Sequence, residues 1–177
     1  MLTKSDIEKY FIAEKQESLL FLIIGIIAII CAIVFILFLK NNFWRGAALS
    51  LIVVGFIQCI VGFTVYNRSD KDRANNVYAF GMNPQQLKQK ELPRMEAVNK
   101  NFVVYRWIEI ALIIVGIFLI FRFKKNATYN DSWSGNAFWY GLGISLTIQS
   151  LLMLSADYFA EKRALIYTQQ LTAFAKK

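Results

Sequence analysis

Glu109 is the one acidic residue that lies inside a predicted apolar span of this sequence, and Arg106 precedes it by about one helical turn. A carboxylate in apolar surroundings has a raised pKa, so Glu109 could exchange protons near neutral pH and couple them to transport. The alternative is an ion pair between Arg106 and Glu109, because residues three apart on a helix share a face. We expect the ion pair.

A second group of charged residues flanks the apolar stretches, where we expect the helix ends to converge. Such a group could bind a cation, an anionic lipid headgroup or a charged segment of a partner protein. Salt bridges that set the helix register are the commoner outcome, and we expect them here. With Arg106 and Glu109, this inner collar comprises Glu14, Glu17, Arg68, Asp70, Asp157, Glu161, Lys162 and Arg163.

Two glutamines, Gln58 and Gln149, lie inside other apolar stretches. Amide side chains in such surroundings hydrogen-bond between helices, so their presence does not require a pore. They are also polar groups that a channel could use if several copies of the chain assembled.

Most catalytic chemistry lacks its usual residues in this chain. There is no histidine, and there are only two cysteines, Cys31 and Cys59. Zinc sites, haem ligation and His-dependent nucleophilic pairs therefore lack their parts, and phosphate-binding glycine loops are missing too. We expect no catalytic residue, no metal and no cofactor, and we infer that the protein is not an enzyme.

The composition places the chain in a membrane. Hydrophobic residues make up 56% of the 177 residues, and the mean hydropathy is +0.42, too apolar for an ordinary water-soluble domain. Apolar runs of about 20 residues predict helices that cross a bilayer. The first run is too long for a signal peptide, and no cleavage site follows it. The predicted spans are 19–39, 46–66, 102–121 and 137–156.

The segments beside these spans predict helices and not loops. Ser5-Asp6-Ile7-Glu8 has the form of a capping box, so we expect a helix to start there. Asn83-Pro84 starts another helix, which Pro93 should kink or restart. Periodic apolar residues favour packing of these extensions as a continuation of the bundle. The extensions are 5–18, 67–101 and 157–175, and residues 1–177 form a single membrane domain, an all-α up-down bundle of four spans.

The second and fourth spans open with similar sequences. Residues 43–51 and 138–146 share Phe, Trp, Gly, Ser and Leu in matched register. Tryptophan and glycine in matched register are rarer than a general similarity between apolar helices. We interpret the chain as two copies of one helical hairpin, related by a pseudo-two-fold axis along the membrane normal.

Four spans place both termini on the same side of the membrane. That side carries 15 of the 20 lysines and arginines, so the positive-inside rule predicts that both termini are cytoplasmic. We expect a multi-pass protein of a bacterial inner membrane. The net charge of +8 fits contact with anionic membrane lipids, whereas a nucleic-acid reader would need a dedicated soluble basic surface.

The missing catalytic chemistry and the extended helical surface favour a role in protein-protein contacts. We expect an accessory subunit, a scaffold or an immunity-type protein that neutralises a membrane-targeting partner. The first alternative is a small transporter or oligomeric channel that uses Glu109 and the glutamines. The second is a lipid-modifying enzyme that uses the collar acids. The expected partners are membrane lipids and a protein, with a homo-oligomer as a further option and no nucleic acid.

Overall fold

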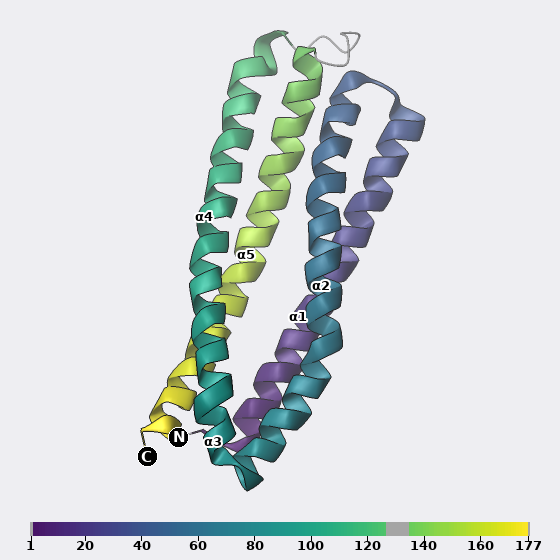
Figure 1. The fold of residues 1–177 in the computed structure, drawn as a ribbon. Coiled ribbons are helices and arrows are strands. Elements are labelled where there is room, and N and C mark those ends of the chain that lie inside the picture. The colour runs from purple at the N-terminus through teal and green to yellow at the C-terminus, as the bar shows by residue number, and fades with distance from the viewer. Residues whose placement is uncertain (1, 127–134, 177) are drawn as a thin grey trace. The chain divides into compact units, whose positions relative to one another are not determined.

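The computed structural model describes residues 2–126 and 135–176, and every regular element in these ranges is helical. Four helices are long and apolar enough to cross a membrane, so the predicted all-helical fold with four such helices is confirmed. They are α1 (Lys4–Val34), α2 (Asn42–Met82), α4 (Leu92–Phe123) and α5 (Asn136–Ala175) (Figure 1). The short elements are the π-helices η1 (Phe35–Leu39) and η2 (Leu87–Glu91), the helix α3 (Pro84–Gln86) and the 3-10 helix η3 (Lys124–Asn126).

The first helix starts earlier than predicted. Thr3 and Asp6 form the capping box: the Thr3 backbone N–H donates to Asp6 Oδ2 at 2.9 Å, and the Asp6 N–H donates to Thr3 Oγ1 at 3.2 Å. The predicted box at Ser5 and Glu8 is wrong, because Ser5 already lies inside α1. The hydrogen bond from the Thr3 side chain lowers the pKa of Asp6.

The predicted break after α2 is confirmed, because α2 ends at Met82 and Pro84 opens α3. Pro93 lies in the first turn of α4, directly after the π-helix η2. Proline has no N–H, and its ring clashes with the carbonyl four residues earlier. A wider π turn just before Pro93 accommodates both effects, so the helix restarts here and is not broken.

The chain forms two compact units. Unit 1 comprises Met1–Leu20, Gly62–Arg106 and Ala156–Lys177, and unit 2 comprises Phe21–Val61 and Trp107–Ser155.

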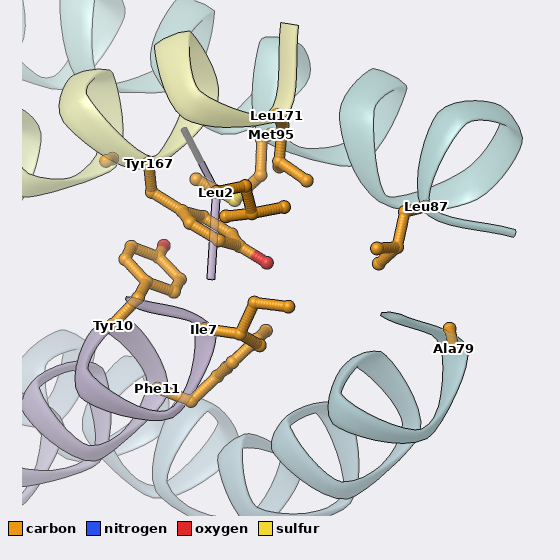
Figure 2. Packing of buried hydrophobic residues seen from close by; sticks show 10 residues of the cluster. Leu2, Ile7, Tyr10, Phe11, Ala79, Leu87, Met95, Tyr167 and Leu171 are labelled. Atoms are coloured by element: carbon orange, nitrogen blue, oxygen red, sulfur yellow. The ribbon is translucent and has the colours of Figure 1, made fainter. Parts of the chain in front are cut away.

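Unit 1 has an apolar core to which α1, α2, α4 and α5 all contribute (Figure 2). Tyr10 on α1 stacks on Tyr167 on α5, with ring centroids 4.3 Å apart. Phe11, Met95 and Leu171 are almost fully buried in the same core. The periodic apolar residues of the predicted extensions therefore have a common place to pack.

Unit 2 is held together by close helix contacts at glycines. Between α1 and α2, a Cβ added at Gly25 would lie 2.7 Å from the carbonyl oxygen of Gly55. Between α4 and α5, a Cβ added at Gly143 would lie 2.8 Å from the carbonyl oxygen of Gly116. In each hairpin the two helices therefore approach most closely at a pair of glycines, because larger residues would hold the two backbones apart.

The α2–α5 interface of unit 2 is reciprocal. A Cβ at Gly46 would overlap the carbonyl oxygen of Phe138, and a Cβ at Gly141 would overlap that of Phe43. These residues occupy matched positions in the two similar segments, 43–51 and 138–146. The two halves of the chain therefore touch each other through the same positions.

Candidate functional site

The inner collar lies largely in unit 1, where α1, α2, α4 and α5 each supply charged side chains. On α1 and α2, Arg68 contacts Glu14 at 3.4 Å, and Ser69 Oγ donates to Glu14 Oε2 at 3.0 Å. Lys15 forms an ion pair with Asp70, and its ammonium group lies 4.7 Å from the centroid of the Tyr66 ring.

Two further ion pairs join other helices of unit 1. Arg106 on α4 pairs with Glu161 on α5. Arg163 on α5 pairs with Glu17 on α1 through two guanidinium nitrogens and both carboxylate oxygens. Ion pairs therefore link α1 to α2, α4 to α5 and α1 to α5, which sets the register of three helix interfaces.

Three collar residues, Glu109, Asp157 and Lys162, take no part in these ion pairs, and Glu109 has other interactions. Lys162 is exposed, and Asp157 is half-buried on α5 and has interactions of its own. Among the described residues, no three Cys, Asp or Glu side chains come together in a way that could hold a metal ion. The collar carboxylates thus serve mainly as partners of basic side chains.

The ion pairs on α1–α2 and on α4–α5 follow one spacing. Lys15 and Asp70 are 55 residues apart, and so are Arg106 and Glu161. The number of residues from Lys15 on α1 to Arg106 on α4 therefore equals the number from Asp70 on α2 to Glu161 on α5. This interval is the signal that could have revealed the partners of Lys15 and Arg106 from the sequence.

The polar residues singled out inside the predicted spans are buried in unit 2. Glu109 on α4 is 2% exposed, Gln58 on α2 is 2% exposed and Gln149 on α5 is 5% exposed. Ser50 Oγ donates to Gln149 Oε1 at 3.3 Å, so this glutamine forms an interhelical hydrogen bond. Glu109 belongs to unit 2, whereas Arg106 belongs to unit 1 and pairs with Glu161.

A charged pair that we did not anticipate lies beside the core of unit 1, with its acid buried and its base half-buried. Glu91 is 5% exposed and accepts hydrogen bonds from Arg94 at 2.8 and 2.7 Å. Burial acts to lower the pKa of Arg94, but the hydrogen bonds and charge of Glu91 raise it overall. Burial, with a smaller effect of nearby carboxylates, raises the pKa of Tyr10 and of Tyr167. The spacing of three residues between Glu91 and Arg94 is the sequence signal for this pair.

Unit 1 also has an open groove of about 330 Å³ between α4 and α5. Asn99 on the α4 wall donates a hydrogen bond of 2.8 Å to Thr168 Oγ1 on the α5 wall. The remaining lining residues are Leu165, Gln169, Thr172, Ala173 and Lys176, none of which belongs to the predicted collar. The groove and the collar are therefore different features of this unit.

The chain matches no protein-family model, no curated protein and no solved structure.

Proposed function

We propose that the chain is a multi-pass protein of a bacterial inner membrane, with unit 2 in the bilayer and both termini in the cytoplasm. Large apolar side chains on all four helices of unit 2 are exposed, and lipid would cover them. Examples are Ile27, Phe56, Phe118 and Leu152. At the outer helix ends, Trp44 packs on Phe35 and Trp139 packs on Phe123, as interfacial aromatic residues do.

Within this membrane unit, we propose that the two hairpins arose by duplication. The reciprocal glycine contacts of α2 and α5 support this, since Gly46 and Gly141 occupy matched positions. The ion pairs support it as well, because Lys15 to Arg106 and Asp70 to Glu161 span equal intervals. The same interval separates Gln58 from Gln149, and it is four residues shorter than the interval from Gly46 to Gly141.

We further propose that the protein is a non-enzymatic module that acts through protein-protein contacts made by unit 1. The observation that carries this proposal is that unit 1 has an apolar core and an ion-paired collar of its own. A preformed helical body loses little conformational entropy when a partner binds. An accessory subunit, a scaffold and an immunity-type protein would all use such a body.

The end of α2 offers a surface for such a partner. Tyr78 is 63% exposed and Met82 is 72% exposed, and the two lie four residues apart on one face of the helix. Aromatic and methionine side chains that remain exposed are typical anchors of protein interfaces.

The test is co-purification of the partner after cross-linking in cells. Tyr78→Ala combined with Met82→Ala should abolish it, because the anchors are lost while the core is intact. Ile27→Ala, an exposed position that lipid would cover, is the matched control and should leave the partner bound. Glu109→Gln should also leave it bound. Loss of the partner in Glu109→Gln, with retention in the Tyr78 and Met82 variant, would contradict the proposal.

The second candidate is a small transporter or oligomeric channel, and the burial of Glu109 in unit 2 favours it. A buried carboxylate in a membrane is a functional candidate by default. Reconstitution in liposomes decides between the two: pH-dependent or ion-dependent flux that Glu109→Gln abolishes would promote this candidate. The third candidate, a lipid-modifying enzyme, would need collar carboxylates that the ion pairs already engage.

A further inference from the structure

Three polar side chains in unit 2 are at least nine-tenths buried, and each has an atom that lacks a hydrogen-bonding partner among the described residues. Gln58 is 2% exposed, Gln149 is 5% exposed and Ser150 is fully buried. The atoms concerned are Gln58 Oε1, Gln149 Nε2 and Ser150 Oγ. The proposed partner-binding role of unit 1 does not account for them.

Leaving these atoms unpaired would be costly. A buried donor or acceptor without a partner destabilises a protein, because the group has lost its hydrogen bonds to water and gained none in return. Buried polar atoms in native proteins are almost always paired with protein or with ordered water. Three such atoms in one small helical unit therefore indicate that something binds them.

Neighbouring contacts place two of these side chains at helix interfaces. Ser50 on α2 donates to Gln149 Oε1, which fixes the Gln149 amide in the α2–α5 interface with its NH₂ group left over. Ser150 follows Gly143 by two helical turns, so it lies on the face of α5 that contacts α4. Glu109 precedes Gly116 by two turns on the facing side of α4. Because α4 and α5 are antiparallel, Ser150 and Glu109 lie at similar levels.

The kinds of atom present select the ligand. Water both donates and accepts, so it satisfies an amide oxygen, an amide N–H and a hydroxyl alike. We propose that the interior of unit 2 is hydrated, with ordered water bound separately to the Gln58, Gln149 and Ser150 side chains.

The first test measures hydration directly in the unaltered protein. Water-edited solid-state NMR of the chain in lipid bilayers, labelled with ¹⁵N at the glutamine side chains and ¹³C at the leucine methyls, follows magnetisation transferred from water. The Gln58 and Gln149 amides should gain signal about as fast as the exposed Gln16 amide. The methyl groups of Leu146, which is buried on α5 like Gln149, should gain signal slowly. Build-up at Gln58 and Gln149 as slow as at Leu146 would overturn the proposal.

The second test uses the sign of a stability change. Gln58→Met removes a side chain for which no hydrogen bond to another residue is recorded. If water binds it, the substitution should lower the thermal midpoint by several degrees, whereas Leu146→Met should leave it nearly unchanged. An unpaired amide oxygen in a dry interior would give the opposite result, since its removal would raise the midpoint. A raised or unchanged midpoint in Gln58→Met would therefore refute the hydrated interior.

Discussion

Ser50 and Ser145 place their hydroxyl oxygens 2.6 Å apart across the α2–α5 interface. The two serines hold matched positions in the segments 43–51 and 138–146, so this hydrogen bond joins equivalent residues of the two hairpins. Ser145 Oγ also contacts the carbonyl oxygen of Ala47 at 3.2 Å, and Ser50 Oγ contacts Gln149. The interface between the hairpins is therefore both closely packed and polar at its centre.

The first prediction concerns the glycines of this interface. Gly46→Ala and Gly141→Ala should each destabilise the protein, by about 2 kcal/mol, because the new Cβ would overlap a carbonyl oxygen of the facing helix. The equivalence of the two contacts predicts losses of similar size. Thermal unfolding in detergent measures both.

Gly81→Ala is the matched control, because no atom lies within 4 Å of a Cβ built there. Alanine is a better helix former, so stability should stay the same or rise by up to about 1 kcal/mol. Tolerance of alanine at both Gly46 and Gly141 would show that the α2–α5 contact is not as close as described.

The second prediction concerns the serine pair itself. Ser50→Ala and Ser145→Ala should each cost about 1 kcal/mol, the usual value for a buried hydrogen bond. The double substitution should cost less than the two single losses added together, because both remove the same bond. A double-mutant cycle checks this, and strictly additive losses would mean that the two hydroxyls do not interact.

The third prediction is a pH dependence from Lys15 and Asp70. Their hydrogen bond lowers the pKa of Asp70 and raises that of Lys15. The contribution of Asp70 is complete above its unfolded pKa of about 4 and is lost as the pH falls through its lower folded pKa. The contribution of Lys15 is complete below about 10.4 and is lost as the pH rises through its higher folded pKa. The stabilisation by this pair should therefore be greatest between about pH 4 and about pH 10.4 and should decline progressively below and above these values.

Asp70→Asn checks the acid side of this dependence. It should lower the midpoint near neutral pH and weaken the further decline below about pH 4, because the carboxylate no longer titrates. Arg73, which contacts Asp70 at 3.3 Å, is retained in the variant. An acid decline identical to that of the unaltered chain would exclude the contribution of Asp70.

The fourth prediction concerns the two stacked tyrosines. Because burial raises the pKa of Tyr10 and Tyr167, both should stay protonated at pH values where exposed tyrosines ionise, about 10. Stability should fall as the pH rises above that value, since the unfolded chain loses these protons more easily. Ultraviolet absorbance of tyrosinate follows the ionisation.

A phenylalanine variant assigns the steps of that titration. Tyr167→Phe should leave the ordinary tyrosine ionisation step unchanged, because burial keeps the Tyr167 hydroxyl out of that step. A smaller ordinary step in Tyr167→Phe would mean that the Tyr167 hydroxyl is accessible to solvent.

The sequence predicted the four long helices because runs of apolar residues are a local signal. It also predicted the break at Asn83-Pro84, since proline has a fixed backbone angle and no N–H. It misplaced the first helix start, because Thr3 with Asp6 and Ser5 with Glu8 fit a capping box almost equally well. Only the packing around the helix start distinguishes the two.

The partners of the collar residues were beyond local reasoning. Arg106 has an acid three residues away at Glu109, yet the structure pairs it with Glu161 on the next long helix. The choice depends on how α4 and α5 are shifted against each other, which a single helix does not encode. The pair of Glu91 and Arg94 had a local spacing signal, but its packing depends on another helix, because the Arg94 guanidinium lies over the ring of Phe11 on α1.

The most direct test of the account is the topology of the chain in the membrane. Fluorescent-protein and alkaline-phosphatase reporters would be fused in turn to each terminus and inserted after Lys40, in the turn between α1 and α2. Unit 2 as a four-span membrane unit predicts fluorescence from both termini and phosphatase activity only from the insertion after Lys40. Termini that report from opposite sides, or a chain recovered as an aqueous monomer without detergent, would contradict it.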